Sequence, residues 1–299
     1  MSEILRTPEA RFANLPGFDY APRYLEWRGM RIHYVDERPA QAAALTHSVL
    51  CLHGEPTWSY LYRKMIPPFL ASGARVVAPD FPGFGRSDKP VDDDAYSFDF
   101  HRAFLLDFVE RLDLNNLTLV VQDWGGILGL TLPMEAPARY ARLLVMNTAL
   151  GTGDTPLTEG FLAWRAYVAK NPNLDCAKLL ARSCPPLSVT EAAAYEAPFP
   201  DATYKGGVRR FPQLVPDAPD APGAALSRRA RDWWRTAWKG DAFMAIGATD
   251  PVLGPGPMRA LHREIRNCAE PWVHAEAGHF VQEWGDEVAR AALAHWHGA

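Results

Sequence analysis

The chain has 299 residues, 48% of them hydrophobic, and a formal net charge of -4. This length is enough for one large core, or for a core with an inserted subdomain, so stability requires neither disulfides nor a structural metal. The slightly acidic balance, with arginines spread along the chain, argues against a nucleic-acid partner. No apolar run approaches the roughly 18 residues of a membrane span.

The cysteines and the first residues of the chain point to a cytoplasmic protein. The four cysteines are scattered, with no Cys-x-x-Cys pair and no zinc-type spacing with histidine. Residues 1–18 lack the apolar stretch of a secretory signal. We therefore expect a soluble, cytoplasmic monomer that needs no metal and no cofactor and has no membrane partner.

The first part of the chain, and its last third, predict an α/β architecture. Residues 24–28 and 30–35 flank Gly29 and predict an antiparallel hairpin at a sheet edge. Brief Val, Leu and Ile-rich runs closed by turn residues indicate buried parallel strands. These runs are residues 48–52, 75–78, 117–121, 143–146, 243–246 and 272–275. Helix-length amphipathic segments such as 104–112 and 258–266 lie between them, which favours a sheet covered on both faces.

The alternation of strands and helices stops after residue 146 and resumes at residue 243. The intervening sequence predicts helices at 161–170, 174–182 and 190–197, followed by a proline-rich linker at 211–222. We therefore expect a core domain made of residues 1–150 and 228–299, with a helical cap at 151–227. The cap would lie over the carboxyl edge of the strands, where open α/β sheets bind their ligands.

The sequence VQDWGG at residues 121–126 follows a strong strand and opens a helix, as a nucleophile elbow does. Such a turn is strained and needs small residues where the chain crosses its neighbours, here at Gly125 and Gly126. The residue at the centre of the turn is Asp123. An alternative interpretation is that Asp123 only caps the following helix.

Two further residues stand in the order that a catalytic triad on this type of sheet requires, namely nucleophile, acid and histidine. Asp250 follows the strand at 243–246, and His279 follows the last predicted strand. Three such residues at three strand ends favour catalysis over helix capping. We therefore predict that Asp123 is the nucleophile, Asp250 the acid and His279 the base.

The sequence HGEPTW at residues 53–58 directly follows another strand. A His-Gly loop at this position supplies one backbone N–H to an oxyanion hole, and the residue after the nucleophile supplies the second. The predicted donors are therefore Glu55 and Trp124. The glycine-rich turn at residues 80–87 is interpreted as structural.

Taken together, these motifs resemble the α/β-hydrolase superfamily and, within it, the haloalkane dehalogenases of the first subfamily. HGEPTW combined with QDWGG carries most of this resemblance, which extends from LRTP at residues 5–8 to AGHFVQE near the end of the chain. It implies an α/β-hydrolase fold, a mostly parallel sheet flanked by helices with an inserted helical cap. It also implies Trp124 and Trp164 as halide-binding indoles. Asn147, where another subfamily keeps its acid, supports Asp250.

The expected chemistry is displacement at a saturated carbon. A carboxylate already carries charge at neutral pH and needs no base to attack. The resemblance implies a small halogenated alkane as substrate, with water as the second reactant and halide as a product. It also implies an apolar pocket. The residues it suggests for the pocket are Ile127, Phe161, Phe211, Pro212, Val215, Val252 and Leu253.

Two other functions fit parts of the same pattern. An epoxide hydrolase shares the fold, the nucleophile and the histidine, but it must protonate an alkoxide, usually with tyrosines of the cap. Tyr167, Tyr195 and Tyr204 are the candidates for that role. A non-catalytic scaffold on the same fold is the second alternative, and the intact triad argues against it.

Overall fold

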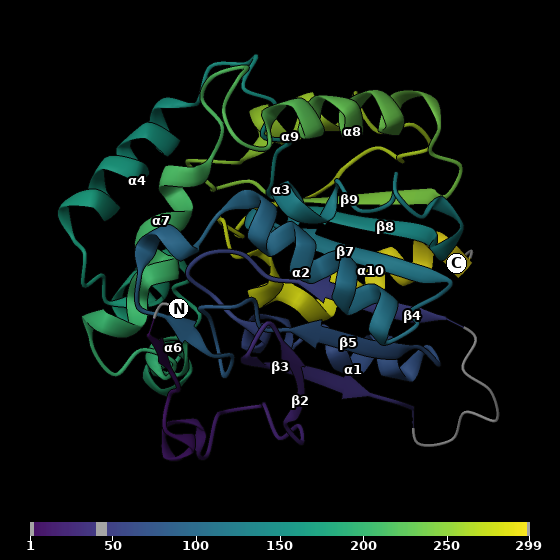
Figure 1. Cartoon of the computed structure of the whole chain (residues 1–299). Helices are drawn as coiled ribbons and strands as arrows, with labels where there is room; N and C mark the ends of the chain where they lie inside the picture. Colours follow the sequence, from purple (N-terminus) through teal and green to yellow (C-terminus); the bar gives the residue numbers. More distant parts are fainter. Residues whose placement is uncertain (1–2, 40–46, 298–299) are drawn as a thin grey trace.

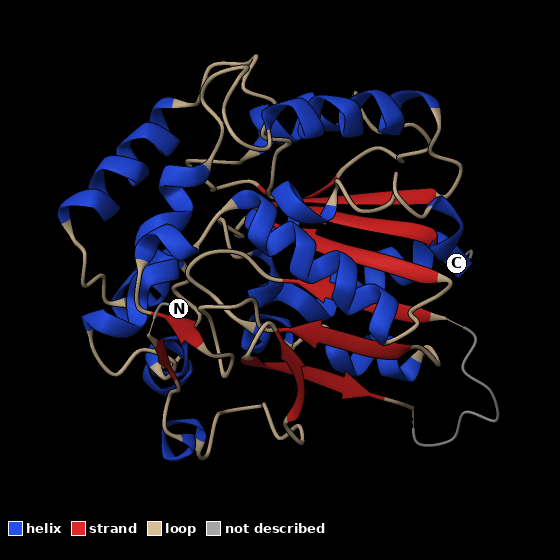
Figure 2. Ribbon diagram, in the orientation of Figure 1, coloured by secondary structure: helices blue, strands red, loops and turns tan. Residues whose placement is uncertain are grey.

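The structure, a computed structural model, describes residues 3–39 and 47–297. Within these ranges eight strands form one mostly parallel sheet, flanked by helices on both faces (Figures 1 and 2). The strands lie in the spatial order β10 (Trp272–His274), β9 (Asp241–Gly247), β8 (Tyr140–Met146), β7 (Leu117–Gln122), β4 (Ser48–Leu52), β5 (Arg75–Pro79), β3 (Met30–Glu37) and β2 (Arg23–Trp27). β1 (Ile4–Leu5) pairs with β6 (Lys89–Pro90) in a separate small ladder.

The pairing confirms the edge hairpin and the parallel strands expected from the sequence. β2 and β3 are antiparallel, with Trp27 opposite Met30, and β2 forms the edge of the sheet. The five neighbouring pairs from β5 to β10 are all parallel. The next pair, β3 with β5, is antiparallel. Parallel strands end at the same edge of a sheet, so β7, β9 and the loop after β10 bring their following residues together.

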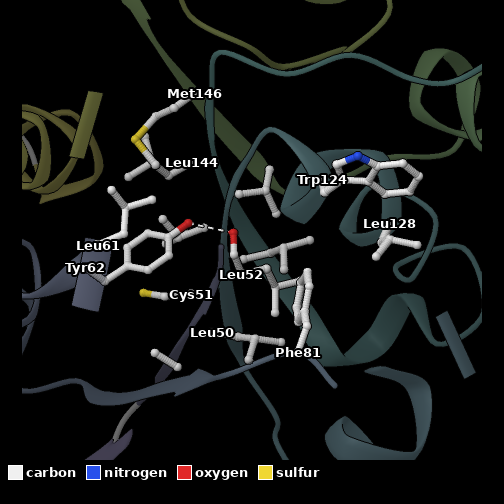
Figure 3. Packing of buried hydrophobic residues seen from close by; sticks show 14 of the residues in the cluster. Leu50, Cys51, Leu52, Leu61, Tyr62, Phe81, Trp124, Leu128, Leu144 and Met146 are labelled. Atoms are coloured by element: carbon white, nitrogen blue, oxygen red, sulfur yellow. Dashed lines mark hydrogen bonds between the residues drawn. The ribbon is translucent and has the colours of Figure 1, made fainter. Parts of the chain in front are cut away.

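The central strands are apolar because helices cover both of their faces. Every residue of β4 and of β7 is buried, as expected for strands inside a parallel sheet. Figure 3 shows Leu50 and Leu52 of β4 among Phe81 and Leu128, with Trp124 at the edge of the cluster. The Tyr62 hydroxyl donates to the backbone oxygen of Leu52 at 2.7 Å, which fixes the segment after the His-Gly loop against the sheet (Figure 3).

The core helices lie in two layers on either side of this sheet. α1 and α10 cover one face, while α2 and α3 lie together on the other (Figure 1). The core helices are α1 (Ile66–Ala71), α2 (Phe98–Arg111), α3 (Trp124–Gly129), α8 (Ala224–Thr236), α9 (Pro255–His262) and α10 (Gly285–His297). No helix in the described part of the chain is both long and apolar enough to cross a membrane.

The segment between β8 and α8 contains the helices that were expected from the sequence. They are α4 (Glu159–Lys170), α5 (Cys176–Ser183) and α6 (Val189–Glu196). A further helix that was not expected, α7 (Gly206–Leu214), follows them, and these helices project beyond one edge of the sheet (Figure 1). Their N-termini are capped by Thr158, Asp175 and Ser188 for the first three. These polar caps explain why each helix begins where it does.

Two details of the sequence prediction are changed by the structure. The proline-rich linker predicted at 211–222 is wrong for its first residues, because α7 extends to Leu214 with Pro212 inside it. Pro212 lies in the last turn of the helix, so its missing N–H removes only one hydrogen bond, and its ring is buried. In addition, α8 runs across the boundary predicted between residues 227 and 228. The division into core and cap stays a prediction, and residues 1–2, 40–46 and 298–299 of the predicted core lie outside the described chain.

A buried ionic cluster joins helix α6 to the core. The two terminal guanidinium nitrogens of Arg63 donate to the Glu283 carboxylate, each at 2.7 Å. From α6, the Tyr195 hydroxyl also donates to Glu283, and Glu191 accepts from Arg63 at 3.0 Å. We call these four residues the Arg63 cluster. Removing either partner of a buried ion pair leaves an uncompensated charge, so the cluster holds α6 firmly against the core.

Candidate active site

Asp123 occupies a strained turn between β7 and α3. Its φ is 48° and its ψ is -126°, and its side chain makes no capping hydrogen bond to α3. The helix-capping alternative is therefore wrong. Two hydrogen bonds to backbone atoms hold the turn. The Asp123 backbone N–H donates to the Asn147 backbone oxygen at 3.0 Å, and the Thr148 hydroxyl donates to the Asp123 backbone oxygen at 2.7 Å. Strain of this kind persists only where surrounding contacts enforce it.

The glycines of the elbow are required by close packing. A Cβ atom on Gly125 would lie 1.9 Å from the backbone oxygen of Leu52, and one on Gly126 would lie 2.1 Å from the Thr148 hydroxyl. A Cβ on Gly54 would collide with the Asp123 carboxylate at 2.3 Å. The elbow and the His-Gly loop can approach each other only because these three positions carry no side chain.

The His-Gly loop donates a backbone hydrogen bond to Asp123. The Glu55 N–H lies 2.8 Å from Asp123 Oδ1. Trp124 is the first residue of α3, and the N–H groups of a first helical turn have no acceptor within their own helix. The two N–H groups expected to form an oxyanion hole therefore come from the two segments that flank the carboxylate.

His279 lies between the other two members of the predicted triad. Its Nδ1 is 2.8 Å from Asp250 Oδ2, and its Nε2 is 3.6 Å from Asp123 Oδ2. Asp250 is fixed in turn by the Asn147 side-chain amide and by the Val252 N–H, each at 2.8 Å. The structure thus brings the three residues together in the predicted order, with the acid at the far side of the imidazole from the nucleophile.

The interaction between His279 and its neighbouring carboxylates raises the pKa of His279 and lowers the pKa of Asp250. Burial opposes the charge on the imidazole, but the carboxylates of Asp250 and Asp123 outweigh burial and raise the pKa of His279 to about 10. Burial also opposes the charge on Asp250, yet His279, Asn147 and the Val252 N–H lower the pKa of Asp250 to about 2. The acid therefore stays ionised and orients the imidazole throughout the neutral range.

The Glu55 side chain is buried beside the nucleophile and has an unusual environment. Its Oε1 has no hydrogen-bond partner among the described residues. Burial, followed by the negative charge of Asp123, raises the pKa of the Glu55 carboxyl well above its usual range, while His279 and a hydrogen bond with the Trp164 side chain act against this rise. The same hydrogen bond places the Trp164 indole, on α4, next to the loop that contacts Asp123.

Trp124, the other predicted halide-binding indole, directly follows Asp123 as the first residue of α3. It is buried, and its ring packs against the ring of Phe211 on α7, with 4.7 Å between the centroids. Phe211 also contacts Phe84 at 4.7 Å. The two predicted halide-binding indoles therefore come from different elements, Trp124 from α3 and Trp164 from α4.

A cavity of about 440 Å³ opens at Asp123. Four residues expected in the pocket line it, namely Ile127, Phe161, Val215 and Leu253. Most of its remaining wall comes from the loop 149–158 and from α9, with Arg231 and Glu264 also in the lining. The cavity is therefore mostly apolar and reaches from the nucleophile to a charged region.

The other three residues expected in the pocket do not line this cavity in the described structure. Phe211 supports the Trp124 ring instead. The Pro212 oxygen accepts a hydrogen bond from Arg165 at 3.0 Å. The Val252 backbone donates to Asp250 and accepts from Thr158 at 3.3 Å. These residues hold the wall and the acid in place rather than face the cavity.

The tyrosines of the epoxide hydrolase alternative lie elsewhere. Tyr195 is fully buried, with its hydroxyl in the Arg63 cluster. Tyr167 is exposed on α4. Tyr167, Tyr195 and Tyr204, all within the described chain, are absent from the cavity wall. This placement does not favour the epoxide hydrolase alternative.

Two residues of the site were not assigned these contacts from the sequence. Asn147 donates to Asp250, and Gln122 contacts His279, with its side-chain nitrogen 3.0 Å from the His279 backbone oxygen. Gln122 ends the buried strand β7, and Asn147 directly follows the buried end of β8; a buried polar residue at such a position is the signal that could have identified them. In the described residues, no group of three or more His, Cys, Asp or Glu side chains could hold a metal ion.

Comparison with known proteins identifies the class first. Residues 47–286 match a family model described as the alpha/beta hydrolase fold. The chain is 42% identical to a haloalkane dehalogenase of Psychrobacter cryohalolentis, with 99% of this chain and 98% of that protein covered. It is 39% identical to one of Mycolicibacterium paratuberculosis, with 97% of each covered.

A solved structure agrees with these relatives. The haloalkane dehalogenase DpaA from Paraglaciecola agarilytica, described as tetrameric, is 48% identical and superposes with a TM-score of 0.95 over 99% of this chain and all of that chain. The protein is thus an α/β hydrolase. More narrowly, the chain belongs to the haloalkane dehalogenase family, which confirms the resemblance seen in the sequence.

Proposed function

We propose that this protein hydrolyses the carbon-halogen bond of small haloalkanes, giving a primary alcohol, a halide ion and a proton. One observation carries most of the proposal. Asp123 lines a mostly apolar cavity, with one carboxylate oxygen held by the Glu55 N–H and with the His279–Asp250 pair beside the other. Family membership supplies the class of substrate.

The first half-reaction would be a displacement by Asp123. Its Oδ2, which does not accept the Glu55 hydrogen bond, attacks the carbon that carries the halogen. The carbon-halogen bond breaks, its electrons leave with the halide, and an alkyl ester forms on Asp123. The indole N–H groups of Trp124 and Trp164 would stabilise the departing halide without offering it a competing acceptor.

The second half-reaction would hydrolyse this ester. His279 takes a proton from water, whose oxygen attacks the carboxyl carbon of Asp123 while Asp250 stabilises the resulting imidazolium. The N–H groups of Glu55 and Trp124 hold the oxyanion. Collapse of this intermediate breaks the bond from the acyl carbon to the alkoxy oxygen. The alkoxy oxygen takes up one of the two protons of the water and leaves as the alcohol, the Asp123 carboxylate is restored, and the second proton passes from the His279 imidazolium to solvent.

A direct product assay tests this function. We expect free halide from 1-bromoalkanes and 1,2-dihaloethanes, and no diol from a short epoxide, since the cavity wall has none of the candidate tyrosines. Halide is measured by ion chromatography and diol by gas chromatography. Formation of diol without halide would replace the proposal by the epoxide alternative. The absence of both products would contradict both activities.

Replacing Trp164 with phenylalanine should weaken halide binding while keeping an aromatic ring on α4. A hydrogen bond to an ion contributes about 1.5 to 3 kcal/mol, so the apparent Kd for bromide should rise roughly 10- to 100-fold. Quenching of the remaining tryptophan fluorescence by bromide measures it. Trp272→Phe, on the edge strand β10, is the matched control and should leave the titration unchanged. An unaltered Kd in Trp164→Phe would assign the second donor to another residue.

The monomeric state and the cytoplasmic location expected from the sequence stay predictions. The DpaA relative is described as tetrameric, which concerns that protein. The mass of this chain in solution, measured by light scattering, distinguishes a monomer from a tetramer.

A further inference from the structure

Gln122, the last residue of β7, contacts the predicted base at two points. It is fully buried and directly precedes the nucleophile. Its side-chain nitrogen lies 3.0 Å from the backbone oxygen of His279 and 3.0 Å from the Nε2 atom of the same residue. The Asp123 carboxylate is farther from this ring nitrogen, with its Oδ2 at 3.6 Å.

The partners of the Gln122 amide define its orientation. The His279 carbonyl can only accept, so the group facing it must be the NH2 of the amide. The amide oxygen points instead to Gln282, whose side-chain nitrogen donates to it at 3.4 Å. One hydrogen of the NH2 then serves the carbonyl of His279, and the second is available to the imidazole Nε2.

This orientation determines the form of the imidazole that fits. A ring nitrogen that accepts from Gln122 carries no hydrogen, so the proton of the neutral imidazole lies on Nδ1, where Asp250 accepts it at 2.8 Å. In this tautomer the Nε2 atom of His279 has a lone pair on the side of the ring away from Asp250, and a general base needs such a lone pair to accept a proton. The Gln122 donor therefore favours the neutral base, whereas an imidazolium would place two N–H groups against each other.

The charged groups around the ring act in the opposite direction. Asp250 from the loop after β9, Asp123 from the elbow and Glu55 from the His-Gly loop are the titratable groups that face His279. As carboxylates, Asp250 and Asp123 favour the protonated ring. Esterification of Asp123 would remove one of these charges, and at that moment the reaction requires His279 without its extra proton.

We propose that Gln122 is a positioning residue for the hydrolytic half-reaction, with its amide anchored on the His279 carbonyl so that an N–H holds the imidazole as a neutral base. This inference rests on the proposed function, because it assigns Gln122 to the second step of the same reaction. It also requires that Gln122 has no part in the first step, in which His279 takes no proton.

The test separates the two steps in Gln122→Met, which keeps a similar volume and removes the donor. Rapid mixing with excess 1-bromoalkane should give a halide burst with a rate within about twofold of the unchanged protein, since displacement needs no base. Ester hydrolysis at pH 7 should fall roughly tenfold, the size of one lost hydrogen bond to the base. The pH midpoint of that step should move upward by about one unit, so the rate recovers at alkaline pH.

Gln122→Glu tests the same idea with an isosteric side chain. A carboxylate at this position accepts instead of donating and adds negative charge, so the midpoint should rise further than in Gln122→Met. Gln213→Met, at an exposed position of α7, is the control and should leave both phases unchanged. Equal losses in the burst and in hydrolysis, or an unshifted midpoint in both Gln122 variants, would overturn the inference. A protein that releases no halide before any substitution would instead contradict the proposed function.

Discussion

Asp123→Ala is expected to lower halide release from 1-bromoalkanes by roughly ten-thousand-fold or more, since removal of a covalent nucleophile leaves only binding and the oxyanion donors. The carboxylate is the atom group that forms the new bond to carbon, and its Oδ1 is already held by the Glu55 N–H at 2.8 Å. An alanine side chain offers no oxygen to attack. The initial rate of halide release at saturating substrate measures the effect.

Asp99→Ala is the matched control for this substitution. Asp99 lies exposed in the first turn of α2, and its loss should leave the rate unchanged. The thermal unfolding midpoints of both variants show whether the fold is retained. Halide release by folded Asp123→Ala above about one per cent of the unsubstituted rate would remove Asp123 as the nucleophile and return the attack to water.

His279→Gln is expected to convert the enzyme into a single-turnover reagent. General base catalysis contributes roughly 100- to 10,000-fold, and the proposed base acts only after the ester has formed. One halide should therefore be released per active site, after which turnover nearly stops. Intact-mass analysis should show a protein heavier by the alkyl group, and peptide mapping should place the added mass on Asp123.

His295→Gln provides the comparison for the histidine substitution. His295 lies on α10 and contacts Asp241 at 3.0 Å, far along the chain from the elbow. It should turn over many substrate molecules and carry no added mass. Continuous turnover by His279→Gln would assign water activation to another group, and loss of the first halide as well would show that His279 takes part in displacement.

The strands could be predicted from the sequence because burial in a parallel sheet leaves a simple apolar signal. β4 was predicted at its observed limits, and β7 and β8 lie within three residues of theirs. The triad could be predicted for a related reason, since residues at the carboxyl ends of neighbouring parallel strands must meet. The chain order of Asp123, Asp250 and His279 then left one geometry for the three side chains.

The helices around the cavity were less predictable because their limits depend on tertiary contacts. Pro212 indicated a linker, yet the burial of Phe211 against Trp124 and Phe84 stabilises the last turn of α7. Residues 224–236 had no helix prediction, although α8 buries Ser227, Ala230 and Trp234 at helical spacing. The cavity wall depends on how such helices pack, which no local pattern contains.

The hydrogen bonds that support the triad could not be predicted from the sequence either. Gln122 could be placed beside the nucleophile, but its amide points to a residue 157 positions away in the chain. The capping alternative for Asp123 likewise needed coordinates, because capping preference and the elbow place an aspartate at the same position. Only the absence of a capping bond, and the contact with Glu55, distinguish the two.

The Arg63 cluster and the cavity engage different parts of the molecule, and this separation bears on how the enzyme could be diversified. The cluster fastens α6 next to the segment that follows His279, whereas the cavity wall far from Asp123 is drawn largely from the loop 149–158 and α9. Residues such as Ala260 can thus change in volume without touching the triad or its support. Libraries at Ala260 and at the other lining residues of α9, with Met258 kept for its contact with Thr148, offer laboratory evolution a route to new substrate lengths.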